Sequence, residues 1–426
     1  MPEAVPEAVP EAVPEAVPKA VPKAVNEAAG TKATSGPAPD PSTSATGTAG
    51  SAPSEEATLE LVIPGSLETR TGGYVYDRRL VAALRADGHR VRVHELPGDY
   101  PWPDERARAA AAAAFARIDD GARVVIDGLT CGALPEIVHG AARRLRLFAL
   151  VHHPLAAESG LAADAAALLH ERERRALEAV SGTITTSTAT ARELVDGYGV
   201  DARRLRTVTP GTDAAPAARG STDGTTRLLC VATLTPRKGH LTLVEALARL
   251  GRRDWQLRCV GSTTRDPATT AALAARMAAL GLDDGRVLLD GEADEATLDA
   301  RYAEADLFVL ATRYEGYGMV FDEALACGLP IVASGHGAVP DTVPADAGLL
   351  VPPDDVDALH AALSRWFDEA ELREALRRGA ARARGERRSW TAAGRDFAEA
   401  LTALSRLSGE ATRDEETGTG GREGVR

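Results

Sequence analysis

Short apolar segments alternate with longer amphipathic segments along most of the chain. Residues 59–65, LELVIPG, have the apolar content of a strand, and residues 72–89, GGYVYDRRLVAALRADGH, repeat apolar residues at helical spacing. This alternation predicts repeated βα units and a parallel sheet. Further strands of this first series are expected at 90–96, 122–128, 146–153 and 182–187.

A second series of strands and helices follows the first. Its strands are expected at 226–234, 255–261, 286–291, 305–312 and 329–334. The segment between the two series, GTDAAPAARGSTDGTT at residues 211–226, is rich in small residues and poor in apolar periodicity. We therefore predict an α/β protein of two doubly wound, Rossmann-like domains, residues 58–220 and 221–388, which face each other across a cleft. Ligands bind at the carboxyl ends of the strands in such sheets.

The two ends of the chain have a different character. Residues 1–57 open with PEAV and PKAV repeats, and recurrent proline predicts an extended, disordered arm. Residues 389–407 are predicted to form a helix that crosses back to the first domain. Residues 408–426 are polar and are expected to be a flexible tail.

Composition narrows the class of protein. The net charge of −13 argues against nucleic acid as a partner, since phosphate binding needs a concentrated basic surface. The four cysteines form no close pair in sequence, which disfavours a zinc ribbon or a disulfide framework and favours a reducing cytoplasm. No apolar stretch approaches the roughly 20 residues of a membrane span, and no signal peptide is evident. The sequence predicts a cytoplasmic protein without a transmembrane segment.

Two strand ends of the first domain carry candidate binding groups. Gly72 and Gly73 open a helix and would let its backbone amides approach an anion. A tight turn is the commoner use of such a pair. His152 and His153 follow another strand, where a histidine pair favours function over a role in the core. No further metal ligand is evident near them in sequence.

Cations and carboxylates follow two strands of the second domain. Arg237 and Lys238 lie between a strand and a helix, where they could face a phosphate, although a solvated turn is the simpler interpretation. Glu315 precedes a glycine-spaced turn, and Glu323 lies in the helix that follows it. Two separated acceptors suit a polyhydroxylated ligand. The turn itself, Gly316, Tyr317 and Gly318, would expose amides at a helix N-terminus.

With these residues in view, the chain resembles the retaining GT-B glycosyltransferases of family 4, the relatives of glycogen and sucrose synthases. The resemblance covers residues 58–407. Its most specific element is the Glu-x7-Glu motif, Glu315 to Glu323 within EGYGMVFDEALACGLP. The supporting segments are TGGYVYDRRLVAALRADGHRV, TSTATARELVDGYGV, TVTPGTD and TPRKGHLTLVEAL.

The resemblance implies a nucleotide sugar as donor and a role for each candidate. Lys238, with Arg237 beside it, would neutralise the diphosphate. Glu323 would hold the ribose hydroxyls, and Glu315 with the turn amides would hold the donor sugar. The cleft histidine of the family matches His152. With Lys238 and Glu315, His152 completes the predicted catalytic set, and Gly72 and Gly73 join the donor-binding set.

The chain departs from the family in two places. Ala232, Thr233 and Leu234 stand where many members have Gly-Arg-Leu, so Arg237 would have to replace that arginine. His153 stands where an aspartate often follows the cleft histidine, which bears on the class of acceptor.

The implied reaction is glycosyl transfer with retention, in which the leaving diphosphate takes up the acceptor proton. Preorganised cations and helix-end amides would stabilise the growing charge, so we expect no metal or other cofactor. Asp355 to Asp357, the acidic DVD segment, is better explained by helix capping.

Two other functions remain open. An epimerase or hydrolase of the same fold would consume the donor without an acceptor. A non-catalytic partner protein could bind sugar nucleotides and dock through the proline-rich arm.

A small soluble acceptor is expected, because the first domain shows no basic amphipathic helix of the kind that binds membrane surfaces.

Overall fold

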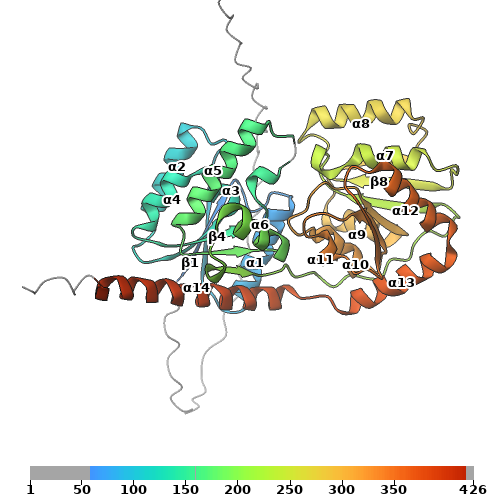
Figure 1. The fold of residues 1–426 in the computed structure, drawn as a ribbon. Helices are drawn as coiled ribbons and strands as arrows, with labels where there is room; N and C mark the ends of the chain where they lie inside the picture. Colours follow the sequence, from blue (N-terminus) through green and yellow to red (C-terminus); the bar gives the residue numbers. More distant parts are fainter. Residues whose placement is uncertain (1–57, 159, 419–426) are drawn as a thin grey trace, which may run out of the picture. The chain divides into compact units, whose positions relative to one another are not determined.

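The computed structural model describes residues 58–158 and 160–418, with side chains described as far as residue 407 (Figure 1). The arm predicted at residues 1–57 lies outside the described residues, and so do residues 419–426 of the predicted tail. The predicted fold class is confirmed, because the described chain contains two six-stranded, wholly parallel sheets flanked by helices.

The first sheet has the strand order β2-β1-β3-β4-β5-β6. Each of its five predicted strands is present, and β6 is an additional short edge strand. The strands are β1 (Leu59–Pro64), β2 (Val91–Leu96), β3 (Arg123–Asp127), β4 (Arg146–Val151), β5 (Gly182–Thr185) and β6 (Leu205–Thr207).

Apolar residues on both faces of the first sheet explain why its strands read as continuous apolar runs. In β4, Leu147, Ala149 and Val151 pack into the core on one face, and Phe148 and Leu150 pack into the core on the other. Successive side chains of a strand point to opposite faces, so a strand covered on both sides needs no polar alternation.

The second sheet has the order β12-β11-β10-β7-β8-β9. Its edge strand β12 was not predicted, whereas the other five were. The strands are β7 (Thr226–Val231), β8 (Trp255–Val260), β9 (Val287–Gly291), β10 (Leu307–Leu310), β11 (Ile331–Ser334) and β12 (Gly348–Val351).

Helices follow most of the strands, as βα units require. Those associated with the first sheet are α1 (Gly72–Ala86), α2 (Glu105–Ala116), α3 (Gly128–Ala133), α4 (Pro135–Ala142), α5 (Ala163–Ala179) and α6 (Thr188–Tyr198), with 3₁₀ turns η1 (Leu155–Ala157) and η2 (Ala202–Arg204). Those of the second are η3 (Pro236–Lys238), α7 (His240–Ala248), α8 (Pro267–Ala279), α9 (Glu295–Glu304), α10 (Met319–Ala326), α11 (Val339–Thr342), α12 (Val356–Asp368) and α13 (Ala370–Gly385).

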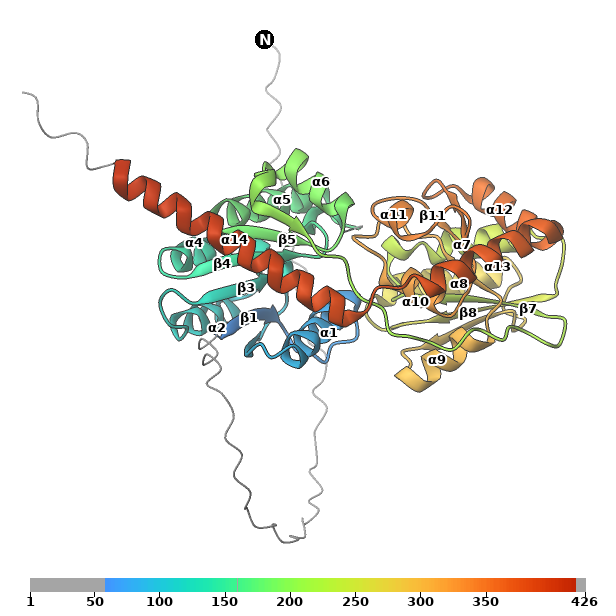
Figure 2. The same ribbon diagram turned by 90° about the horizontal axis from the view of Figure 1, so that it is seen from below.

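The last helix, α14 (Trp390–Gly418), runs alongside α1 on the first sheet (Figure 2). Its residues Phe397, Leu401 and Leu404 are buried in the same core as Tyr76 and Leu80 of α1. The last helix therefore completes one face of the first sheet, although it follows the second sheet in sequence.

The DVD segment opens α12 as a cap, because Asp355 accepts a hydrogen bond from the amide of Ala358 at 2.8 Å. No described helix combines the length and apolar character needed to cross a membrane.

Candidate functional site

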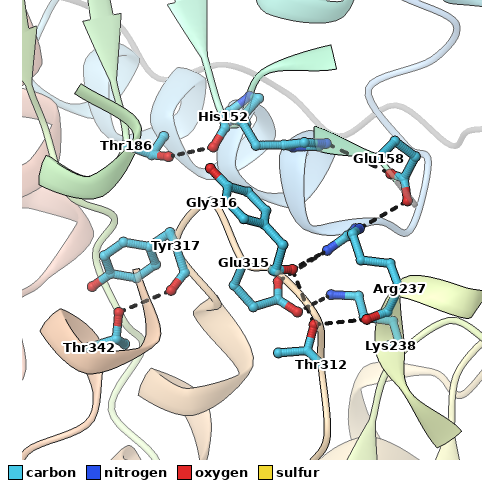
Figure 3. Close-up of polar contacts among 12 residues, drawn as sticks. His152, Glu158, Thr186, Arg237, Lys238, Thr312, Glu315, Gly316, Tyr317 and Thr342 are labelled. Carbon is cyan, nitrogen blue, oxygen red and sulfur yellow. Dashed lines mark hydrogen bonds and ion pairs between the residues drawn. The ribbon is translucent and has the colours of Figure 1, made fainter. Parts of the chain in front are cut away.

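Four charged side chains meet at the carboxyl ends of β7 and β10 and at the segment that follows β4 (Figure 3). They are Lys238, Arg237, Glu315 and Glu158. Lys238 Nζ donates to Glu315 Oε1 at 2.7 Å, and Arg237 Nη1 lies 3.6 Å from Glu315 Oε2. Arg237 Nε also donates to Glu158 at 3.0 Å. Since β7 and β10 are neighbours in the parallel sheet, their carboxyl ends bring together residues that are 77 positions apart in sequence. The predicted diphosphate and donor-sugar residues are thus in direct contact.

Burial and charge act against each other in this ion-pair cluster. Burial alone would raise the pKa of Glu315, but the charges of Lys238 and Arg237 outweigh it and lower that pKa. Burial lowers the pKa of Lys238, and Glu315 offsets only part of that effect. For Glu158, His153 and Arg237 overcome burial and lower the carboxyl pKa to about 2. Both carboxylates therefore remain charged at neutral pH.

The glycine-spaced turn lies directly against the backbone of His152. A Cβ atom on Gly316 would stand 2.1 Å from the carbonyl oxygen of His152, so only glycine fits there. Thr190 donates its hydroxyl to the Gly316 carbonyl at 3.3 Å, and Thr186 donates to the carbonyl of His152 at 3.3 Å. Gly318 has a left-handed φ of 88°, which lets the turn enter α10. The turn and the histidine strand end therefore meet.

The two histidines have different surroundings. His152 Nε2 lies 3.2 Å from Asp77 Oδ1 and 3.4 Å from Asp127 Oδ2, and both carboxylates are buried. Burial disfavours the charged imidazole, but Asp77 and Asp127 outweigh it and raise the pKa of His152 to about 10. His153 Nε2 instead lies 3.8 Å from Glu158. His152 is thus held by buried acids, whereas His153 borders the ion-pair cluster.

Glu323 and Tyr317 point to different partners from Glu315. Glu323 accepts a hydrogen bond from the Tyr302 hydroxyl at 2.9 Å, and burial raises the pKa of its carboxyl group. The hydroxyl of Tyr317 donates to Asp322 at 2.5 Å, away from Lys238. The two glutamates of the motif therefore do not share a partner, and the phenol of Tyr317 does not join the ion-pair cluster.

Three helices near these residues begin without a side-chain cap among the described residues, namely α1, α7 and α10. Their N-terminal amides are thus not used by a capping side chain. An aspartate or serine caps α2, α3, α6, α8, α9 and α12, whereas α4, α5, α11 and α13 also begin without a side-chain cap. Gly73 lies in the first turn of α1, beside the ring of His152. A Cβ atom on Gly73 would stand 3.2 Å from Cδ2 of that ring, whereas a Cβ atom on Gly72 would meet open space. Uncapped helix ends can stabilise an anion.

Two cavities border this region. A cavity of about 240 Å³ is lined by residues that include Arg70, Thr233, Ser262, Arg265 and Glu292. A wider one, of about 740 Å³, is lined by residues that include Arg192, Arg313, Tyr314 and His336. The smaller lies beyond β7 toward β8 and β9, and the wider borders the residues just before Glu315.

Two clusters among the described residues have the composition of metal ligands. Asp77, Asp127 and His152 form one, and Cys230, His240 and Cys259 form the other. The second is fully buried, with Cys230 Sγ 3.7 Å from His240 Nε2. The expectation that the protein uses no metal stays a prediction.

Sequence reasoning did not identify several residues that hold the site together. Asp77 and Asp127 surround His152, Glu158 binds Arg237, and Tyr302 binds Glu323. Only Asp127 had a signal that could have been used, because it is the last residue of a buried strand and so lies at the edge where ligands bind.

Comparisons with known protein families divide the chain in the same way as its sheets. Residues 71–215 match the family model for Glycosyltransferase Family 4. Residues 225–369 match the model for Glycosyl transferases group 1. Together the two matches cover more than half of the 426 residues.

Individual relatives match shorter segments. A GDP-mannose-dependent monoacylated alpha-(1-6)-phosphatidylinositol monomannoside mannosyltransferase of Corynebacterium glutamicum is 34% identical over 188 residues, 42% of this chain and 48% of that protein. A D-inositol 3-phosphate glycosyltransferase of Saccharomonospora viridis is 33% identical over 221 residues, 47% of this chain and 50% of that protein. The chain thus spans about half the length of these curated relatives.

Solved structures share the fold. A sucrose-phosphate synthase from Thermosynechococcus elongatus superposes with a TM-score of 0.70 at 21% identity, over 82% of this chain and all of that one. At this identity the likeness concerns the fold alone. The two family matches and the two parallel sheets together show that the chain belongs to the group 1 and family 4 glycosyltransferases and has their GT-B fold.

Proposed function

We propose that the protein transfers a glycosyl group from a nucleotide sugar to an acceptor hydroxyl, with retention of configuration at the anomeric carbon. The observation that supports this most is the contact of Lys238 and Arg237 with Glu315 at adjoining strand ends. It puts cations suited to a diphosphate beside a carboxylate suited to sugar hydroxyls.

In the proposed reaction, the bond from the anomeric carbon to the diphosphate oxygen breaks, and a bond to the acceptor oxygen forms on the same face. The acceptor proton passes to the leaving diphosphate. Lys238, Arg237 and the amides of the uncapped helices would stabilise the charge that grows on that group. Glu315 and the amides of residues 316–318 would hold the sugar, and Glu323 the ribose.

His152 is proposed to face the reacting sugar in its charged form. Asp77 and Asp127 hold its Nε2 and keep it protonated at neutral pH. A charged imidazole near the anomeric centre would interact with sugar hydroxyls or with the departing phosphate, and it could not act as a base. This assignment agrees with a mechanism in which the diphosphate itself takes the proton.

The remaining parts of the proposal concern metal, acceptor and location. Metal independence is supported by the two cations, which can do the work of a divalent ion on the diphosphate.

We propose a small soluble acceptor, since the net charge of −13 opposes attraction to anionic lipid surfaces. The relatives are named for acceptors of both kinds, an inositol phosphate and a phosphatidylinositol mannoside. A cytoplasmic location is supported by the four described cysteines, which are all free.

The test is incubation of the full chain with nucleotide sugars, including those of mannose, and with inositol phosphates or a metabolite extract. Mass spectrometry would detect a glycosylated product, and proton coupling constants would give its anomeric configuration. An acceptor-dependent product with the donor's configuration is expected. Consumption of donor without an acceptor would instead identify a hydrolase or an epimerase. Donor binding without any turnover would identify a binding protein.

A further inference from the structure

The smaller cavity lies at the far end of a row of strand ends. Strands β10, β7, β8 and β9 are consecutive neighbours in the second sheet, so their carboxyl ends form one continuous edge. Glu315 follows β10 and Lys238 follows β7. The cavity comes next along this edge, with Ser262 and Arg265 after β8 and Glu292 after β9. A nucleotide whose phosphates lie at Lys238 can therefore extend its base into the cavity.

The size of the cavity suits part of a nucleotide. Its volume of about 240 Å³ is below the roughly 300–1,000 Å³ of pockets that enclose whole drug-sized ligands. A loop from the first sheet borders it, because Arg70 Nη1 donates to the carbonyl oxygen of Ala293 at 3.0 Å. The cavity therefore lies where both halves of the fold contribute residues.

Two opposite charges on this cavity are not paired with each other. The side chains of Arg265 and Glu292 both line it, and neither makes an ion pair or a hydrogen bond with any other side chain that the structure describes. Elsewhere along the same sheet edge, Arg237, Lys238 and Glu315 are all paired. Arg265 and Glu292 are exposed, whereas the paired Arg237, Lys238 and Glu315 are largely buried, so the arginine and the glutamate on the cavity are both accessible to a ligand group.

We propose that this cavity binds guanine, so that the donor is a guanosine diphosphate sugar. Guanine presents two acceptors, O6 and N7, on one edge, and these match the paired donors of an arginine. It presents N1–H and the N2 amino group on another edge, which match the two oxygens of a carboxylate. Arg265 would bind the first edge and Glu292 the second. This inference rests on the proposed function, because it assigns the base of the proposed donor.

Other bases satisfy only one of the two charges. Adenine has an amino donor beside N7, in the position where guanine has the O6 acceptor, so it would place a donor against Arg265. Uracil offers a single N–H donor to Glu292, and it lacks an N7 acceptor for Arg265. A base that leaves Arg265 or Glu292 unpaired loses binding free energy, because the charged group gives up water without gaining a hydrogen bond. This loss for adenine or uracil is larger than the gain from one added contact to guanine.

The experiment compares GDP, UDP and ADP by calorimetry on the full chain and on Glu292→Gln. Glutamine keeps the size of the side chain but places an amide donor against the donors of guanine. Asp299→Asn is the matched control, since it removes one negative charge from α9, which follows directly after the cavity, at an exposed residue that does not line it. Melting curves of all three proteins establish that each is folded.

GDP is expected to bind at least about tenfold more tightly than UDP or ADP. Glu292→Gln should weaken GDP binding by about ten- to a hundredfold and UDP binding clearly less, since uracil has one N–H donor for the carboxylate where guanine has two, and Asp299→Asn should change neither. UDP or ADP affinity equal to that of GDP would overturn the guanine assignment and leave the proposed function intact. GDP preference that survives Glu292→Gln would overturn the role of Glu292. If no nucleoside diphosphate binds, the proposed function fails together with this inference.

Discussion

Replacing Glu315 by glutamine should change stability, nucleotide affinity and turnover in different directions. In the structure, Glu315 is the acceptor that Lys238 contacts among the described side chains, and it also lies near Arg237. The side chains of Glu315, Lys238 and Arg237 are only 7%, 16% and 14% exposed. The variant therefore leaves Lys238 without a charged partner in a largely buried place.

The magnitudes follow from this geometry. Removing one partner of a buried ion pair costs about 3–5 kcal/mol of folding free energy. We expect a loss of about 3 kcal/mol, because glutamine still accepts a hydrogen bond and Arg237 keeps Glu158. The nucleoside diphosphate should bind more tightly. If the phosphate binds on the far side of Lys238, about 8 Å from the carboxylate, the two charges repel by roughly 2 kcal/mol at an effective dielectric constant of about 20. Loss of this repulsion corresponds to about a thirtyfold gain in affinity.

Turnover should fall while this affinity rises. A hydrogen bond to a charged group is worth about 1.5–3 kcal/mol, so loss of the carboxylate that holds the sugar should lower kcat about ten- to a hundredfold. Thermal unfolding, calorimetry with the nucleoside diphosphate alone and steady-state rates measure the three quantities. Glu178→Gln, an exposed carboxylate on α5, should alter none of them. A parallel loss of nucleoside diphosphate affinity and turnover would refute the reasoning, since it would mean that Glu315 binds the nucleotide itself.

Three further predictions follow from the neighbouring residues. Asp77→Asn should lower the pKa of His152 from about 10, because burial then opposes its charge more effectively. The pKa of His152 in the folded chain lies above its ordinary value of about 6.5. The contribution of the charged His152 to folding stability is therefore complete below pH 6.5 and is lost as pH rises through about 10. In the variant this loss should begin at a lower pH, and NMR titration of the imidazole would show it; an unchanged titration would contradict it. Glu323→Ala should weaken the nucleoside diphosphate and the sugar nucleotide alike, about ten- to a hundredfold, and Tyr302→Phe should do so less, because it removes only the hydrogen bond that orients Glu323. Equal calorimetric affinities of the unmodified chain, Glu323→Ala and Tyr302→Phe for the nucleoside diphosphate would exclude Glu323 from the ribose site. Donor affinity should be the same with and without a chelator, and a large loss with chelator would show that a metal takes part.

The sequence was sufficient for the central strands of both sheets and for the edge strands β2 and β9, but not for the short edge strands β6 and β12. Buried parallel strands such as β4 and β10 have continuous apolar runs, which stand out between polar turns. The strands β6 and β12 are outermost in their sheets and pair on one side only. They have three and four residues and are only partly buried, so their sequences carry little apolar pattern.

The motif residues could be located from sequence, but their partners could not. The spacing of Glu315 and Glu323 and the glycines between them pointed to a ligand site before any coordinates. Yet Glu315 binds Lys238, and Glu323 binds Tyr302. Each partner comes from a different βα unit, so the pairing depends on which strands and helices become neighbours in space.

The sequence by itself therefore determined the alternation of strands and helices, the family and the strand ends that carry the chemistry. These depend on local periodicity and on short motifs, and both can be read along the chain. Only the tertiary structure decided that Asp77 and Asp127 hold His152 and that Glu315 neutralises Lys238. It also decided which residues of α14 and α1 share a core, although the crossing of the last helix to the first domain was predicted from sequence. Those contacts join residues tens to hundreds of positions apart. Strand order and packing fix them, and one sequence read in order contains no direct record of either.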